Sequence, residues 1–296
     1  MYPFPDEFSY KNPKGFSFFN NAISIYSVRF HDYRMLHQIT VLEALFLGLL
    51  QGFTEWFPIS SSGHLVIFQA LLGISVPPDF DILIMAGTIA ALILYFRKKI
   101  FFLLTGVLAG DRSAITYVAL IILAGFPTAV IGFDFKIFFK SLFSQPFIVS
   151  ILIIVTGVFL FIASRKKDNT AEVNTTSALF IGIAQGIAVA PGISRSGSTI
   201  GTALLLGVKP KEAAEFSFLI GIPAMIIASG LTYMEGPASG IGLLPLVAAV
   251  IAAFIAGYSS IGLFMKLLEE NRLYYFAIYC IIAGSAFAVI TRLMGY

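Results

Sequence analysis

Long apolar runs dominate this chain, and short segments between them carry most of its charge. The runs fall near residues 41–57, 82–96, 114–133, 147–163, 178–190, 212–233, 241–264 and 274–291. Several approach the roughly 20 residues that an α-helix needs to cross a bilayer. This pattern predicts an all-α polytopic membrane protein.

Two of the runs stop in clusters of Pro, Gly and Ser and then continue as short apolar stretches. The clusters are residues 57–63 and 191–197. Non-helical polar backbone at membrane depth is tolerated only where it is buried in protein or lines a wet cavity. A helical hairpin that enters and leaves by one face meets this requirement. We therefore predict two re-entrant helical hairpins in addition to about six transmembrane helices.

The two interrupted regions are similar to each other, and the second lies 134 positions after the first (48 to 182). The residues of the first region that recur at this offset are Gly48, Gln51, Gly52, Ile59, Ser60, Ser62 and Gly63. We interpret this as a duplication, with a first repeat over residues 39–172 and a second over 173–296. Each repeat then holds one hairpin and three spans. Because three is odd, the second repeat is inverted relative to the first, as in transporters whose site lies between the repeats.

Composition and charge agree with a membrane protein. Only 12% of residues are charged, and the mean hydropathy is +0.90. A net charge of +3 is not typical of a nucleic-acid-binding protein. Basic loops at 97–112, 165–167, 209–211 and 266–272 share one side in the inverted topology, which makes that side cytoplasmic. Residues 1–38 are polar and aromatic, and we expect a poorly ordered N-terminal extension.

The first hairpin carries the candidate acid–base chemistry. Gln51 and Glu55 are four residues apart and therefore share a helix face. An ionisable group inside a membrane indicates a functional site by default, although an interfacial Glu that reaches water is the alternative. His64 follows the hydroxyls of residues 60–62, and it is either a hydrogen-bonded structural histidine or a catalyst. An adjacent base makes a serine hydroxyl nucleophilic, so we favour catalysis.

The second hairpin carries the candidate phosphate site. Arg195 lies among the hydroxyls of Ser194, Ser196 and Thr199 at the expected start of a short helix. Backbone N–H groups at a helix N-terminus attract anions, and the guanidinium matches phosphate oxygens. A serine N-cap with an arginine that reaches lipid headgroups is the alternative, and we favour phosphate recognition.

Two further acidic residues are matched by the repeat. Asp81 and Glu215 each lie near the start of a span, where they could be metal ligands or charges stabilised by the helix dipole. We favour the structural role. The GxxxxGK[ST], HExxH and CxxC patterns do not occur, so nucleotide hydrolysis and a tetrahedral zinc site have no support.

The two hairpin motifs resemble those of a known family. The segment 51–64, QGFTEWFPISSSGH, is similar to the (E/Q)xxxE–PxSSxGH signature of undecaprenyl-diphosphatases, also known as bacitracin-resistance proteins. The segment 191–199, PGISRSGST, is similar to their PGxSRSxxT signature. The resemblance runs from about Ile39 to the C-terminus. This chain has Gln at position 51, where the signature admits Glu or Gln. Glu55 is therefore the one certain carboxylate of the motif.

The resemblance implies an integral plasma-membrane hydrolase whose site opens to the outer face. Such an enzyme removes the terminal phosphate of a polyprenyl diphosphate and renews the lipid carrier for cell-wall glycan assembly. It implies a divalent cation, Mg²⁺ or Ca²⁺, held mostly by the diphosphate with help from Glu55. By motif position the site residues are Gln51, Glu55, Ser61, His64, Ser194, Arg195 and Thr199.

On this basis we expect Arg195 to bind the diphosphate, together with Ser60, Ser62, Ser194, Ser196 and Thr199. Ser61 is the favoured nucleophile and His64 its general base, with Glu55 orienting the attacking group or moving its proton. A phosphohistidine at His64 and direct attack by water stay open. The expected partners are the polyprenyl diphosphate, membrane lipids and a second copy in a homodimer, with no nucleic acid.

Three alternatives remain at this stage. A transporter or flippase of the lipid phosphate would use the inverted repeat but would need no nucleophile. The other lipid-phosphatase class shares the Ser-Gly-His of residues 62–64, but its second His and Asp do not follow residues 194–195. A non-catalytic lipid-binding protein would bind the headgroup without turnover.

Overall fold

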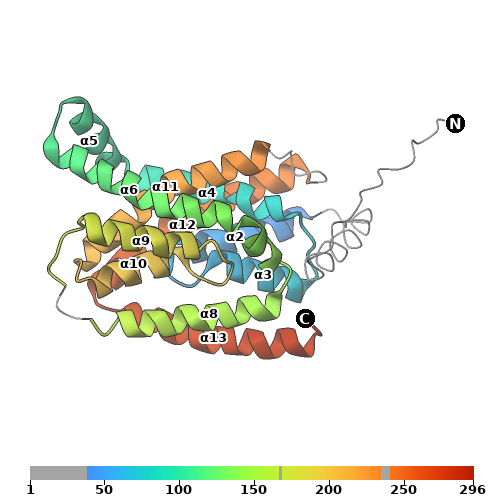
Figure 1. The fold of residues 1–296 in the computed structure, drawn as a ribbon. Helices are drawn as coiled ribbons and strands as arrows, with labels where there is room; N and C mark the ends of the chain where they lie inside the picture. The colour runs from blue at the N-terminus through green and yellow to red at the C-terminus, as the bar shows by residue number, and fades with distance from the viewer. Residues whose placement is uncertain (1–38, 167–168, 235–240) are drawn as a thin grey trace, which may run out of the picture. The chain divides into compact units, whose positions relative to one another are not determined.

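The computed structural model describes residues 39–166, 169–234 and 241–296, so the predicted extension 1–38 lies outside the described residues. Over the described part the chain folds into α-helices, and its only β-type pairing is a bridge between Ala171 and Val208 (Figure 1). Within this part, five helices are long and apolar enough to cross a membrane, or six if a bent pair forms one span. The prediction of an all-α polytopic membrane protein is confirmed.

The helices of the first half are α2 (Val41–Trp56), α3 (Ser61–Leu72), α4 (Pro78–Tyr95), α5 (Arg97–Leu108), α6 (Arg112–Asp134), α7 (Lys136–Leu142) and α8 (Pro146–Ala163). The helices of the second half are α9 (Thr175–Ile187), α10 (Arg195–Leu205), α11 (Pro210–Met234), α12 (Leu243–Glu269) and α13 (Leu273–Leu293).

Two helices occupy segments between the predicted apolar runs, one of them the segment 97–112 that the sequence analysis treated as a loop. Helix α5 follows α4 after a bend of 70° and occupies the basic segment that begins at Arg97. The basic residues indicate the end of a membrane span. They do not end the helical structure, because lysine and arginine are good helix formers. Helix α7 fills most of the segment 134–145. Charge therefore located the ends of the spans but not the ends of the helices.

The two hairpins pack against helices of the opposite half. Helix α2 lies along α12, and α9 lies along α6. Gly48 faces the backbone of Ala249, and the repeat-matched Gly182 faces the backbone of Ala124 in the same way. A side chain at either glycine would collide with the facing carbonyl, so small residues permit these close crossings.

In this reciprocal packing each half supplies the partner of the other half's hairpin, and the inverted orientation of the second repeat stays a prediction. Helices α8 and α13, the last helix of each half, also lie side by side (Figure 1). The boundary at residues 172 and 173, and the re-entrant course of each hairpin through a bilayer, stay predictions.

Candidate active site

Each hairpin turns at a serine that caps its second helix. Helix α2 ends before Pro58, because a proline disfavours helical geometry in the residue that precedes it. Ser60 then caps α3 and accepts a hydrogen bond from the Gly63 amide at 3.2 Å. In the second hairpin Ser194 caps α10 and accepts from the Gly197 amide at 3.0 Å. Each turn therefore lies at a helix N-terminus, where backbone N–H groups favour an anion.

The two turns meet directly. The Ser60 hydroxyl oxygen also accepts a hydrogen bond from the amide of Gly192, at 3.1 Å. A Cβ at Gly63 would lie 2.9 Å from the Cα of Gly192, so the backbones touch where the hairpins cross. Ser60 has a φ of 70°, which is unfavourable for a residue with a side chain. Such strain persists only where surrounding contacts impose it, and it concentrates at functional sites.

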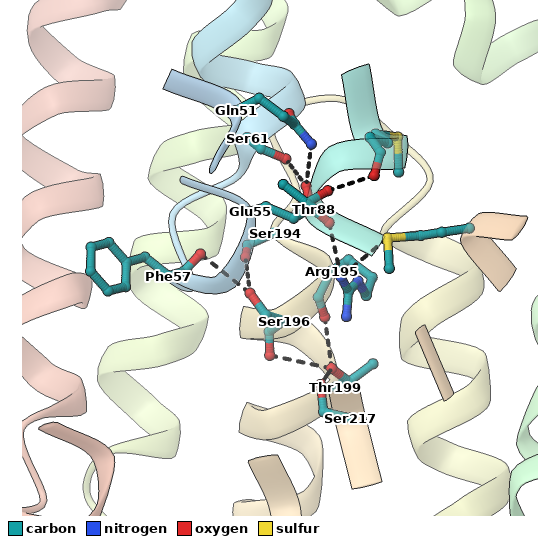
Figure 2. A network of polar contacts seen from close by, with 12 residues as sticks. Gln51, Glu55, Phe57, Ser61, Thr88, Ser194, Arg195, Ser196, Thr199 and Ser217 are labelled. Carbon is teal, nitrogen blue, oxygen red and sulfur yellow. Dashed lines mark hydrogen bonds and ion pairs between the residues drawn. The ribbon is translucent and has the colours of Figure 1, made fainter. Parts of the chain in front are cut away.

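Glu55 is the centre of the polar network at this junction (Figure 2). One carboxylate oxygen accepts from Nη2 of Arg195 at 2.8 Å. The other accepts from the Gln51 amide at 3.0 Å and from the Ser61 hydroxyl at 2.5 Å. The structure thus brings together Gln51, Glu55, Ser61 and Arg195, as the sequence analysis predicted.

The ion pair between Glu55 and Arg195 is largely buried, with 6% and 15% of the two side chains exposed. Removing both charges from water costs about as much as their attraction returns, so such a pair is weak evidence for a stabilising role. Charged groups at this depth are more often functional. We therefore interpret the pair as part of a site.

The guanidinium of Arg195 is held on several sides. It lies 5.3 Å from the centre of the Trp56 ring, and Nη2 is 3.6 Å from the sulfur of Met225. Its other terminal nitrogen, Nη1, occupies the space that a side chain at Gly221 would take, 2.6 Å from an ideal Cβ. Nη1 is buried and has no hydrogen-bond partner among the described residues. A buried donor without a partner is costly, which points to an acceptor supplied by a ligand.

His64 lies beside the network, and both of its ring nitrogens are engaged. Nδ1 is 2.8 Å from the carbonyl oxygen of Ser60, and Nε2 is 2.9 Å from the hydroxyl of Tyr279 on α13. A carbonyl can only accept, so Nδ1 carries the proton and Nε2 accepts from the tyrosine. In this structure the Ser61 hydroxyl bonds to Glu55 and not to His64, and the expectation that His64 is the base for Ser61 stays a prediction.

The hydroxyls of the second turn are arranged in two groups. The hydroxyl oxygens of Ser194 and Ser196 are 3.3 Å apart, and the Ser196 hydroxyl also donates to the carbonyl of Phe57. Thr199 donates to the carbonyl of Arg195 at 2.8 Å and contacts the buried hydroxyl of Ser217 (Figure 2). The Thr199 hydroxyl thus has protein partners here, and its expected contact with phosphate stays a prediction. This side chain braces the first turn of α10, which carries Arg195.

The remaining hydroxyls of the first turn differ in exposure. Ser60 is buried, whereas Ser61 and Ser62 are partly exposed. Ser61 and Ser62 can therefore be reached by a ligand, while Ser60 is committed to joining the hairpins.

The sequence analysis missed Tyr279, Ser217 and Thr156. Thr156 on α8 donates to the carbonyl of Gly192 at 3.0 Å and accepts from the amide of Ser194 at 3.1 Å, so it pins the second turn. No local motif marks these residues, since each acts from a span remote in the sequence. Of the three, only Ser217 could have been considered from the sequence, because it lies two positions after Glu215, which the repeat matches with Asp81.

Asp81 and Glu215 have structural partners away from this network. Asp81 accepts from the side chain of Gln69 at 2.7 Å, and Glu215 lies 3.6 Å from the ammonium of Lys99. Across the described ranges no group of three or more His, Cys, Asp and Glu side chains could hold a metal ion. Glu55 is the site's carboxylate, and both of its oxygens are already bonded. The protein residues alone therefore do not fit a resident metal.

Comparison with known proteins covers both hairpins. A family model described as bacitracin resistance protein BacA matches residues 44–286. The undecaprenyl-diphosphatase of Syntrophotalea carbinolica is 42% identical over 262 residues, which are 86% of this chain and 100% of the relative. The protein of the same name from Carboxydothermus hydrogenoformans is 39% identical over 258 residues, covering 84% and 96%. That of Methanococcus vannielii is 34% identical over 246 residues, covering 82% and 97%.

Proposed function

Because this chain belongs to the bacitracin resistance protein BacA family, we propose that it is a membrane phosphatase acting on a polyprenyl diphosphate of the undecaprenyl type. The products are the polyprenyl monophosphate and inorganic phosphate. The observation that carries the proposal is the position of Glu55, which joins the Ser61 hydroxyl of one hairpin to Arg195 of the other.

The geometry suits attack by Ser61 on the terminal phosphorus. As the bond from Oγ to phosphorus forms, the hydroxyl proton passes to Glu55, and the bond from phosphorus to the bridging oxygen breaks. The polyprenyl monophosphate leaves with that oxygen. Glu55 then releases its proton to solvent. A water molecule attacks the phosphoserine phosphorus and passes one proton to the Glu55 carboxylate, the bond from phosphorus to Oγ breaks, and Glu55 returns the proton to Oγ, which restores the Ser61 hydroxyl and releases phosphate.

Arg195 binds the charge that develops on the transferred group. Its Nη1 is a buried donor without a partner among the residues that the structure describes, and Arg195 is the first residue of α10, at a helix N-terminus of the kind that favours phosphate. Fixed donors in a site of low dielectric stabilise such charge without reorganising. His64 keeps the Ser60 turn in place in this account and is not the base for Ser61.

A divalent cation, Mg²⁺ or Ca²⁺, stays a prediction. Since the site offers one carboxylate, Glu55, the cation would arrive with the diphosphate. Chelation with EDTA should then lower turnover, and added Mg²⁺ or Ca²⁺ should restore it.

The wider setting is also part of the proposal. The protein would be a plasma-membrane enzyme with its site open to the outer face, where it renews the lipid carrier for envelope glycans. Apolar flanks beside the site would hold the polyprenyl tail loosely. A homodimer is compatible with this account but plays no part in the chemistry.

The test is phosphate release by purified protein from farnesyl diphosphate, a short-chain substrate. Glu55→Ala and Arg195→Ala should each lose at least about 100-fold in turnover, because a proton acceptor and a charge clamp contribute on this scale. If both variants kept their rate, the proposal would be wrong. Movement of polyprenyl phosphate across liposomes without phosphate release would favour the transporter instead.

A further inference from the structure

A separate polar cavity lies between the C-terminal end of α8 and the turn that joins α12 to α13. Its volume is about 560 Å³, and it is lined by Phe161, Ser164, Arg165, Lys166, Asn271 and Tyr274. Pockets of this size hold small ligands or lipid headgroups.

This cavity is remote from the hairpin junction. The turn at Gly192 packs against the carbonyl of Val149, near the start of α8. From Val149 to the last residue of α8, Ala163, the helix rises roughly 21 Å at about 1.5 Å per residue. The cavity therefore belongs to a different region from the site around Glu55.

The described residues that line this cavity carry net positive charge, and Glu269 lines an adjoining pocket that shares Ser164, Lys166 and Asn271 with it. Arg165 and Lys166 are exposed, and neither forms an ion pair with any residue that the structure describes. Nearby cations differ, since Arg272 is 2.9 Å from Glu270 and Lys209 is 3.6 Å from Glu172. The cavity lining contains no carboxylate. An anion is thus the ligand that this charge distribution favours.

Two of the other lining residues can bind phosphate oxygens. Asn271 and Tyr274 carry side-chain donors, whereas the Ser164 hydroxyl donates to the carbonyl of Phe161 at 2.8 Å. The left-handed backbone of Asn271, with a φ of 56°, forms the turn on this side. The guanidinium of Arg165 lies 4.6 Å from the centre of the Phe161 ring, which holds it over the end of α8.

The flank of the cavity is apolar and exposed. Phe161 in its lining is 39% exposed, and Ile162 next to it is 55% exposed. On the neighbouring helix α13, Ile278 is 43% exposed. Helices α8 and α13 lie side by side here and both are membrane-span candidates (Figure 1). A ligand with a phosphate head and apolar chains fits this combination better than a soluble anion does.

We propose that this cavity binds the phosphate headgroup of a membrane lipid. Arg165 and Lys166 pair with the phosphate, and the acyl or prenyl chains run along the exposed faces of α8 and α13. Basic pockets between the ends of membrane helices bind anionic headgroups in this way. The site is independent of the hydrolytic function proposed above.

The test counts lipids bound to the intact protein by native mass spectrometry. Arg165→Gln/Lys166→Gln is compared with the native chain and with a control, Arg97→Gln/Lys98→Gln, which removes an equal charge at the start of α5. The probes are phosphatidylglycerol, phosphatidylcholine and a polyprenyl monophosphate. Hydrolysis of farnesyl diphosphate should be unchanged in both double variants, which shows that they fold.

We expect the affinity for phosphatidylglycerol to fall about tenfold in the cavity variant and to be unchanged in the control. Phosphatidylcholine, which has no net charge, should bind weakly to all three proteins. Loss of polyprenyl monophosphate binding alone would also support the site and would identify its lipid. Equal binding of both anionic lipids to all three proteins would overturn the proposal.

Discussion

Arg195 donates a hydrogen bond of 2.8 Å to Glu55, although 140 residues separate the two positions in the chain. The contact exists because the two hairpins cross, with Ser60 of one turn bonded to Gly192 of the other. Each half of the chain therefore contributes a part of the site that the other half lacks. The acid and the hydroxyl come from the first hairpin, and the cation comes from the second.

The position of Arg195 depends on a glycine in α11. Gly221→Ala would place a methyl group where Nη1 of Arg195 lies, so the guanidinium must leave its present position. We expect turnover to fall about tenfold or more, because a displaced charge no longer meets the transferred phosphate.

Gly230→Ala is the matched control for this change. It lies on the same helix, and a Cβ there would meet nothing within 4 Å. Phosphate release should be unchanged in this variant. Equal activity of the two variants would contradict the position that we assign to Arg195.

The crossings between the halves predict a stability effect. Gly48→Ala and Gly182→Ala each direct a methyl group into a backbone carbonyl of the opposite half. Overpacking of this kind costs about 1–3 kcal/mol, and thermal unfolding in detergent should occur at lower temperature. Gly125→Ala in α6, where a Cβ meets nothing within 4 Å, should leave the unfolding temperature unchanged or raise it. A native unfolding temperature for both Gly48→Ala and Gly182→Ala would refute the reciprocal packing.

The hydroxyl of Tyr279 fixes the orientation of His64. Tyr279→Phe removes the donor to Nε2, and a hydrogen bond of this kind is worth about 1 kcal/mol. We expect kcat to fall about fivefold with little change in KM, because about 1 kcal/mol corresponds to this factor in rate and our proposal assigns Tyr279 no role in binding the substrate. Tyr275→Phe, one turn earlier and 53% exposed, should behave like the native chain. A full kcat in Tyr279→Phe would contradict the role that we assign to the hydrogen bond between Tyr279 and His64.

Much of this site could be predicted from the sequence. Pro58 and Pro191 marked the turns of the hairpins, and the repeat linked Glu55 with Arg195 before any contact was known. The partner of Ser61 could not be predicted, because Glu55 and His64 are both near it in the sequence. Only the fold shows that His64 contacts Tyr279 on α13 and that Glu55 accepts the hydrogen bond from the Ser61 hydroxyl.

The fold was predictable to a similar degree. Apolar runs located the spans, because a bilayer sets their length. The bend after Tyr95 was missed, since α4 and α5 are both helical and only their packing decides the angle between them. Tyr279 was missed because a tyrosine in an apolar span is usually a contact with lipid or with another helix.

The most direct test of the account compares two neighbouring serines. Ser61→Ala and Ser62→Ala remove equal groups from adjacent positions, but only Ser61 bonds to Glu55. Phosphate release from farnesyl diphosphate should fall at least about 100-fold in Ser61→Ala, because the attacking group is lost, and by no more than a few-fold in Ser62→Ala. Near-native release by Ser61→Ala would contradict the account and would leave His64 or water as the attacking group.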